Sequence, residues 1–451
     1  MKKGMFFALA ASSLLFSACS SDDAVVSTEG QNETVQQIVL QVASSGDGLS
    51  TRAGRPLYSS EALQTIQHVR VLIYNTKTNA IVKDEQLDWT KSDKYDNHGR
   101  QHTLTYKGDK RLEGGSYKVM AVGYSENSDY TYSLDVTGAS LTGKTYSDIT
   151  ATLKEGKKDA EEVFAGDADL KIGVDKNITN FTSGEKNGVA VTLHRQVAGS
   201  FGYFSNIPAK VGDKTAATLR LVVRDKNDKL TFDNFNSSFT ANGVTGSTIK
   251  YYVNGSTSTG AALATTDKFS NGDNGYVLYS IDLKTWFPQL DENGDGVLNA
   301  QDASWKRPDN VKTQVVKGSV FGSNFVIPFK YTEGKSTMEL QLLDADGNII
   351  KHWTVSIPES DLNKVAANGV TDADASIFNV VRNHMYNLGV KTSTGTTTTP
   401  DPSNPTPDPK PDPKPTPDPG KDEPEDLTKS QNLILKVNDN WEVIHKLVLG
   451  D

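Results

Sequence analysis

The residues whose types and spacing most clearly suggest chemistry lie in one short acidic loop, residues 291–302, which read Asp-Glu-Asn-Gly-Asp-Gly-Val-Leu-Asn-Ala-Gln-Asp. This order matches the calcium-binding pattern D-x-N-x-D-G, in which oxygen ligands recur at fixed positions and a glycine makes the sharp turn. The pattern predicts a structural Ca²⁺ site with these ligands: Asp291, Asn293, Asp295, the Val297 carbonyl, Asn299 and Asp302. Flanking prolines argue against paired EF-hand helices, and the alternative is a plain polar loop between strands.

A second chemical feature is the single cysteine, Cys19, because one thiol excludes both a disulfide framework and a cysteine-cluster metal site. It follows two N-terminal lysines, an apolar run over residues 5–16 and two small residues, which is the pattern of an export signal. A cysteine at this place resembles the processing site of bacterial lipoproteins, where the thiol is acylated. The resemblance implies a precursor held in the outer membrane by lipid, with palmitate among the acyl chains. The alternative is an ordinary signal peptide with a chance cysteine.

Other chemistry-bearing patterns do not support an enzyme. Residues 138–145 match the phosphate-binding P-loop formally, but that loop needs a helix beginning at its lysine, and loop and strand patterns follow here. His98 and His102 stand four apart in a polar segment without helical periodicity, and the sequence has no metalloprotease signature. We therefore expect neither a catalytic site nor a cofactor other than calcium.

Composition indicates a turn-rich all-β protein. The 451 residues include 47 Lys and Arg against 56 Asp and Glu, and the net charge of -9 argues against a nucleic-acid partner. Short strands separated by Gly, Asn, Asp and Ser clusters are predicted from about Leu57 onward, and helical periodicity is scarce. The clearest strands are residues 68–74, 117–124, 189–194, 218–224, 276–283, 325–331, 338–343 and 349–357.

The chain ends in an unusual way. Residues 393–430 carry 11 of the 17 prolines and predict an extended polyproline II spacer. Residues 431–451 then predict an amphipathic strand whose apolar face consists of Leu433, Leu435, Val437, Trp441, Val443, Leu447 and Leu449. A lone strand cannot satisfy its own backbone, so it either folds back onto the second domain or is donated to a neighbouring molecule. The long spacer favours donation.

The N-terminus offers a strand that a donor could replace. Residues 34–43 predict a strand, and the polar loop after it contains Arg52. Cleavage after Arg52 by an arginine-specific protease would free the body from the lipid on Cys19 and release the strand. Arg55 is a poorer site because Pro56 follows it. The alternative for Arg52 is a solvated surface residue.

Together these features resemble the fimbrillin, or type V pilin, family of Bacteroidales-type bacteria, especially its stalk subunits. Besides Cys19 and the terminal strand, the resemblance rests on Ser50-Thr51-Arg52-Ala53, Gly115-Ser116-Tyr117-Lys118-Val119, Val163-Phe164-Ala165-Gly166, His194-Arg195-Gln196-Val197-Ala198 and Arg382-Asn383-His384-Met385-Tyr386-Asn387. It implies two tandem transthyretin-like β-sandwich domains, removal of the N-terminal strand and polymerisation by C-terminal strand exchange.

The expected organisation is a signal peptide (1–18), a lipidated propeptide with the exchangeable strand (19–52), an N-terminal sandwich (53–207), a C-terminal sandwich with the calcium loop (208–392), the linker (393–430) and the donor strand (431–451). The expected function is a structural subunit of an adhesive surface fimbria. Its expected partners are copies of itself, other fimbrial subunits and the protease. The alternative is a monomeric surface lipoprotein, or a fimbrial tip or accessory protein, that binds carbohydrate or a host ligand.

Overall fold

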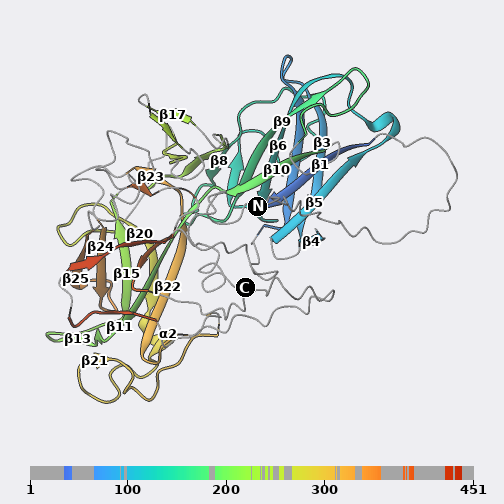
Figure 1. Cartoon of the computed structure of the whole chain (residues 1–451). Helices are drawn as coiled ribbons and strands as arrows, with labels where there is room; N and C mark the ends of the chain where they lie inside the picture. Colours follow the sequence, from blue (N-terminus) through green and yellow to red (C-terminus); the bar gives the residue numbers. More distant parts are fainter. Residues whose placement is uncertain are drawn as a thin grey trace, which may run out of the picture.

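The computed structural model describes residues 35–42, 66–91, 93–95, 99–181, 188–224, 226–233, 235, 239–241, 244–246, 253–258, 267–309, 311, 315–330, 338–356, 379–380, 382, 385–390, 422–429 and 432–438. Cys19, Arg52, Trp441, Val443, Leu447 and Leu449 lie outside these residues. The expectation of an all-β protein is confirmed, since two β-sandwiches lie side by side (Figure 1). None of the described helices is long and apolar enough to cross a membrane.

The first sandwich is one continuous sheet of eight strands in the order β3-β2-β6-β9-β10-β1-β5-β4. β9 and β10 pair only near His194 and Arg195, so the sheet turns over there and encloses its own core. Buried aliphatic side chains from both halves fill that core, among them Ile38, Leu40, Val69, Val71, Val119, Val189 and Val191. The strands are β1 (Gln36–Val42), β2 (His68–Asn75), β3 (Ile81–Asp88), β4 (Asp93–Tyr95), β5 (Gly99–Tyr106), β6 (Gly115–Tyr124), β9 (Phe164–Ile172) and β10 (Gly188–Arg195).

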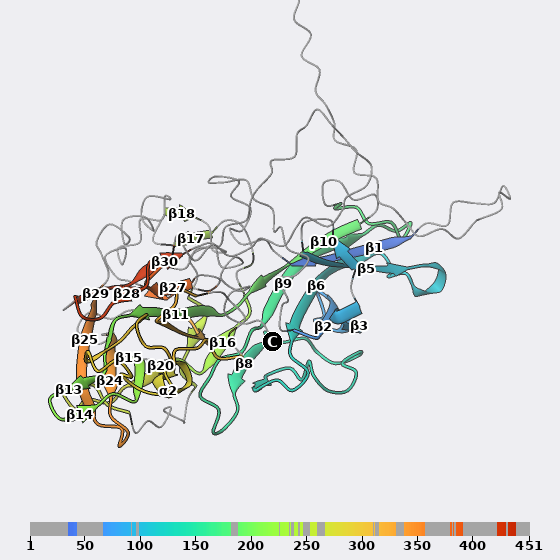
Figure 2. The same ribbon diagram turned by 90° about the horizontal axis from the view of Figure 1, so that it is seen from below.

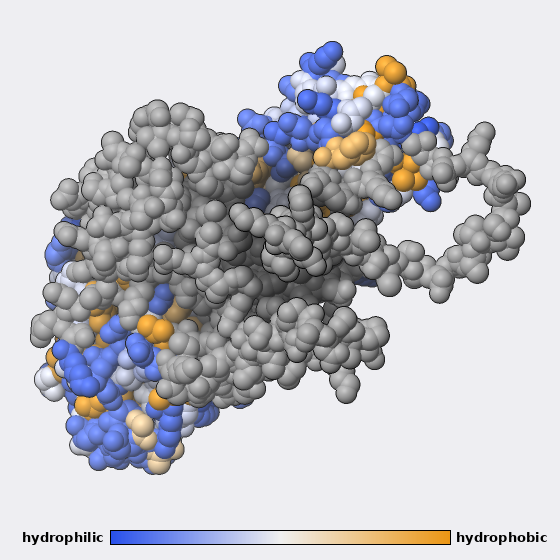
Figure 3. Space-filling model, in the orientation of Figure 1, coloured by the Kyte–Doolittle hydropathy of each residue, from blue (hydrophilic) through white to orange (hydrophobic). Residues whose placement is uncertain are grey.

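The second sandwich packs the sheet β20-β15-β24-β25-β29 against the sheet β22-β11-β27-β30. Its core is richer in aromatic residues and includes Phe201, Tyr203, Leu219, Leu221, Leu340, Leu342 and Trp353. The strands are β11 (Ala198–Ser205), β15 (Thr218–Val223), β20 (Tyr276–Asp282), β22 (Ser319–Val326), β24 (Met338–Leu343), β25 (Ile349–Ser356), β27 (Met385–Leu388), β29 (Asn432–Ile434) and β30 (Lys436–Asn438). On the face seen in Figure 3, the described residues are mainly hydrophilic.

A small shared sheet joins the two sandwiches. Its order is β19-β16-β8-β7, so strands from the first half of the chain pair with strands from the second half (Figure 2). Beside it the buried Gln196 amide receives hydrogen bonds from Asn254 and Arg382, and Arg195 forms a buried ion pair with Glu162. Buried polar groups need such partners, so these contacts hold the two bodies in one arrangement. The shared strands are β7 (Tyr130–Tyr132), β8 (Thr150–Leu153), β16 (Lys229–Thr231) and β19 (Gly255–Ser256).

The chain passes from the first sandwich to the second between β10 and β11, at residues 196–197. This differs from the 207/208 boundary that we expected from the sequence. The reason is that β11 continues almost directly from β10, whereas Ile207–Pro208 is only a two-residue strand that pairs with Leu298 and Val297. The remaining elements are η1 (Trp89–Lys91), η2 (Gly108–Lys110), β12 (Ile207–Pro208), β13 (Lys210–Val211), β14 (Lys214–Thr215), β17 (Phe239–Ala241), β18 (Val244–Gly246), α2 (Leu283–Trp286), β21 (Val297–Leu298), β23 (Phe329–Lys330), β26 (Asn379–Val380) and β28 (Glu425–Asp426).

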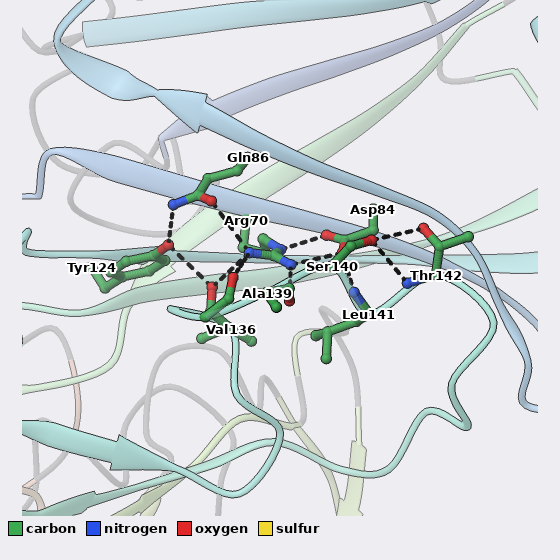
Figure 4. A network of polar contacts seen from close by, with 10 residues as sticks. Arg70, Asp84, Gln86, Tyr124, Val136, Ala139, Ser140, Leu141 and Thr142 are labelled. Carbon is green, nitrogen blue, oxygen red and sulfur yellow. Dashed lines mark hydrogen bonds and ion pairs between the residues drawn. The ribbon is translucent and has the colours of Figure 1, made fainter.

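The P-loop-like segment is part of a buried polar network (Figure 4). Arg70 forms an ion pair with Asp84, and their side chains are 3% and 2% exposed. The Leu141 N–H and the Ser140 hydroxyl donate to Oδ2 of Asp84, at 2.5 and 3.2 Å. The loop therefore already surrounds a carboxylate of its own chain. No helix begins at Lys144, as a phosphate-binding P-loop would require. Its structural role is to supply hydrogen bonds to the buried charges of Arg70 on β2 and Asp84 on β3.

Burial by itself would raise the pKa of Asp84, but the hydrogen bonds from Arg70 and from the Leu141 N–H outweigh it and lower the pKa. The unfolded chain therefore binds a proton at Asp84 more readily than the folded chain does. This carboxylate stabilises the fold above its ordinary pKa of 3.8, and the contribution is lost as the pH falls through the lower folded value.

Replacing Arg70 by methionine should therefore destabilise the protein by about 3–5 kcal/mol, because Asp84 would stay buried without its partner. Urea unfolding of the full chain measures this. Lys91→Met is the matched control, since it breaks the exposed Lys91–Asp88 pair and should leave the unfolding midpoint unchanged. Equal midpoints for the two variants would contradict a structural role for the network.

Candidate strand-exchange site

β1 occupies an interior position in the first sandwich. It pairs in parallel with β10, from Gln37 opposite Gly188 to Val42 opposite Leu193. On its other side it pairs antiparallel with β5, from Gln36 opposite Tyr106 to Gln41 opposite Gln101. Both backbone edges of β1 are therefore used, and the sheet is continuous only because β1 is present (Figure 2).

The side chains of β1 close the core as well. Ile38 and Leu40 are 1% and 0% exposed and pack into the first sandwich, and Val39 on the opposite face is also buried. Burial of one such aliphatic side chain contributes roughly 1.5–3 kcal/mol. Loss of β1 would expose both an apolar gap and two rows of unpaired backbone groups on β5 and β10.

Gln36 fixes the beginning of β1. Its Nε2 donates to the Leu112 carbonyl at 3.0 Å and to the Lys176 carbonyl at 2.8 Å, and its Oε1 accepts from the Leu112 N–H at 2.8 Å. The side chain is 1% exposed, so three backbone groups of two distant loops depend on one amide. The alternating pattern of residues 34–43 does not single out Gln36. The available signal was the pair Gln36-Gln37 before the apolar run Ile38-Val39-Leu40.

The C-terminal segment holds a different kind of position. β29 pairs in parallel with β25, and β30 pairs antiparallel with β27, so the segment is the last strand of each sheet of the second sandwich. Leu433 and Leu435 are 1% and 0% exposed in the core of that same sandwich, and Val437 lies in β30. Residues 432–438 are therefore folded back onto their own molecule, which is the first of the two arrangements considered for the terminal strand.

The end of the predicted spacer is anchored. Residues 422–429, expected as part of the linker 393–430, lie along β11: β28 pairs with Phe204 and Ser205, and Leu427 is fully buried. Asn206 donates to Asp426 at 2.8 Å. Although burial opposes it, the hydrogen bonds from Thr428, Lys429 and Asn206 lower the pKa of Asp426 to about 2. The composition of residues 422–429 is not proline-rich enough to prevent this pairing, so the spacer is shorter than expected.

The predicted calcium loop lies between α2 and β22. The Asp291 carboxylate accepts from the Gly296 N–H at 2.9 Å, and the hydrogen bond from the Asn299 side chain lowers the pKa of Asp295. Asn293 also donates to Asp295, and Val297 pairs with Pro208 through β21. The Asp302 carboxylate is fully buried and accepts from the Asn299 N–H at 2.8 Å. The sequence motif is therefore a compact folded turn.

No protein-family model and no curated protein sequence matches the chain. Similar solved structures include the tip fimbrial protein Mfa3 of Porphyromonas gingivalis (TM-score 0.34, 10% identity, covering 79% of this chain and 94% of that chain) and the fimbrial anchor protein Mfa2 of the same species (0.33, 11%, 79% and 90%). A fimbrial assembly protein of Parabacteroides distasonis is also similar (0.33, 12%, 80% and 93%).

The contrast between an interior strand and an edge strand predicts different opening rates. Amides of β29 and β30 should exchange with deuterium well before those of β1, because each is paired on one side only. Hydrogen exchange of the full uncleaved chain, followed by mass spectrometry, measures this. Equal protection of residues 432–438 and 36–42 would contradict the view that the C-terminal segment is the more readily released.

Proposed function

We propose that the chain is a structural subunit of an adhesive surface fimbria that polymerises by donor-strand exchange. Acylation of Cys19 would hold the precursor in the outer membrane. An arginine-specific protease would then cut after Arg52 and free β1 together with the lipid. The C-terminal segment of another copy would fill the vacated place, which we call the β1 slot: the gap between β5 and β10.

The observation that carries the proposal is the interior position of β1. A missing edge strand leaves a shorter sheet, whereas a missing interior strand separates β10 from β5 and exposes the core between them. Only another strand can restore both the backbone pairing and the buried side chains. The β1 slot is therefore specific for an extended apolar segment.

The placement of the C-terminal segment supports its role as the donor. It is held at the edges of its sheets, so its release leaves both sheets of the second sandwich continuous. Once residues 422–429 also detach, residues 391–430 could span on the order of 100 Å in an extended polyproline II form. That reach is greater than a small domain's diameter and suffices for a neighbouring subunit.

The proteolytic step can be tested with two matched arginine variants. Arg52→Ala should keep Cys19 on the mature protein and prevent fibres, because β1 would remain covalently attached. Arg55→Ala, three residues away and followed by Pro56, should mature and polymerise like the wild type. N-terminal sequencing of surface-extracted protein and electron microscopy measure the two outcomes.

Removal of residues 431–451 tests the donor directly. Before cleavage the truncated protein should keep the β circular-dichroism signal of both sandwiches, because β1 still fills its slot. After cleavage it should form no fibres, because no donor is present. Fibres formed by the truncated protein would contradict strand donation by the C-terminus. A wild-type protein that stays monomeric and begins at acylated Cys19 would instead support the monomeric lipoprotein.

A further inference from the structure

Residues 431–437 repeat the side-chain pattern of β1. β1 reads Gln-Gln-Ile-Val-Leu-Gln-Val over residues 36–42, and the C-terminal segment reads Gln-Asn-Leu-Ile-Leu-Lys-Val over residues 431–437. Three positions are identical, and the other four keep their polar or aliphatic character. The first segment fills an interior slot, and the second lies at sheet edges of the other sandwich. This likeness is the observation that extends the function proposed above.

We propose that residues 431–437 of one subunit enter the β1 slot of another in the register of β1, with Gln431 in the place of Gln36. This inference rests on the proposed strand exchange and specifies its partner and its register. Leu433 and Leu435 would take the core positions of Ile38 and Leu40. Those positions are almost fully buried, so aliphatic side chains of similar volume are needed there.

Gln431 has a specific task in this register. The slot presents the Leu112 N–H and two carbonyls, those of Leu112 and Lys176, to the side chain at the position of Gln36. An apolar side chain there would leave these three backbone groups without their hydrogen-bond partner, which is costly for groups inside a protein. A glutamine offers one acceptor and two donor hydrogens and satisfies all three.

The same requirement fixes the direction of the donor. The apolar centre Leu-Ile-Leu reads alike in both directions, so the core alone would accept either orientation. In the reversed orientation Val437 would face the polar contacts made by Gln36. The donor should therefore run parallel to β10, as β1 does.

Disulfide trapping tests the register, because cleavage after Arg52 leaves no native cysteine. Gln37 lies opposite the exposed Thr105, so Asn432 of the donor should lie there too. Mature Thr105→Cys/Asn432→Cys protein should give disulfide-linked ladders within oxidised fibres. Thr105→Cys/Ile434→Cys is the matched control and should give none, because Ile434 is expected opposite Thr103.

The outcomes separate the register from the exchange itself. Fibres in which Gln101→Cys/Asn432→Cys cross-links and Thr105→Cys/Asn432→Cys does not would overturn the register, since they indicate the reversed strand. Fibres without cross-links in either pair would also overturn it, yet leave strand exchange standing. Failure of the wild type to form fibres would contradict the proposed function. Within the register, Gln431→Leu should slow assembly at least about tenfold, and Asn432→Leu should not.

A second inference rests on a separate observation, the Asp302 carboxylate at the end of the acidic loop. Asp302 is fully buried and its Oδ2 accepts from the loop at Asn299, but its Oδ1 has no hydrogen-bond partner within the described chain. The acidic turn between β24 and β25 behaves differently. There Asp344 is also buried, and both of its oxygens accept hydrogen bonds from Asn348.

A buried carboxylate oxygen without a partner is costly unless a cation compensates it. We infer that residues 291–302 bind one Ca²⁺, with Asp302 closing the site opposite Asp291 and Asp295. No three acidic, histidine or cysteine side chains of the described residues stand close enough to hold a metal already. The carboxylates of Asp291, Asp295 and Asp302 must therefore move closer together as the cation enters.

The loop also contacts the second sandwich, so cation binding to the loop would affect that sandwich. The Gly296 carbonyl accepts from the Ala209 N–H at 2.9 Å, four residues after the end of β11. Gly318, just before β22, approaches so closely that a Cβ there would lie 2.2 Å from the Ala300 nitrogen. A bound cation would therefore stabilise the loop on β11 and β22 at once.

Calorimetric titration of chelator-treated full chain with CaCl₂ tests the site. We expect one Ca²⁺ per chain with a Kd of roughly 10⁻⁴–10⁻³ M, the range of extracellular modules, and a raised Tm. Asp295→Ala and Asp302→Asn should each weaken binding at least about tenfold, whereas Asp346→Asn, which removes an exposed charge from the neighbouring turn, should not.

Asp302→Asn gives a second readout, because it removes an uncompensated buried charge. In the chelated protein it should leave the Tm unchanged or raise it, and it should abolish the response to Ca²⁺. Absence of heat and of any Tm change in the wild type would overturn the site. Wild-type affinity in both Asp295→Ala and Asp302→Asn would overturn it as well, since the cation would then bind elsewhere.

Discussion

An interior strand of a β-sheet must be occupied, and this constraint governs the first sandwich. β1 closes the sheet between β5 and β10 and supplies Ile38 and Leu40 to the core, yet it lies far from β2 in the chain, beyond the loop that holds Arg52. In the proposed assembly, the fold thus depends on a segment whose covalent attachment is cut. The rest of the sandwich can stay folded only if another strand takes its place.

The joint between the two sandwiches must also keep its structure while the β1 slot is emptied and filled again. The shared sheet β19-β16-β8-β7 and the polar contacts of Gln196 connect the two sandwiches through buried groups. Segments around Val163, Gln196 and Arg382, which carry part of the sequence resemblance, meet at this joint. A fibre subunit that loses one strand and gains another benefits from a joint that does not depend on either.

Much of this architecture could be predicted from sequence because alternating hydrophobicity marks β1, β2, β6 and β24 directly. The pairing partners could not, since period-2 patterns do not say which strand lies beside which. Gln36 was missed for that reason: its partners, Leu112 and Lys176, are distant in sequence. The calcium-like loop was recognisable from spacing alone, whereas the unpaired oxygen of Asp302 depends on tertiary packing. The pairing of residues 422–429 with β11 was also not predicted, because these few residues directly follow a long proline-rich stretch.

In the proposed assembly, residues 36–42 and 431–437 have similar patterns. Cleavage after Arg52, and not a difference in affinity for the β1 slot, would therefore determine when the donor strand enters. Two strands of nearly the same pattern should bind the β1 slot with similar strength, so the attached one prevails through its high effective concentration. In the proposed assembly, cleavage after Arg52 would remove that advantage, and the released β1 would diffuse away. Each subunit then has one open slot and one donor on different sandwiches, and such a heterologous contact does not close on itself in a pair. Repeated head to tail, it generates an open filament.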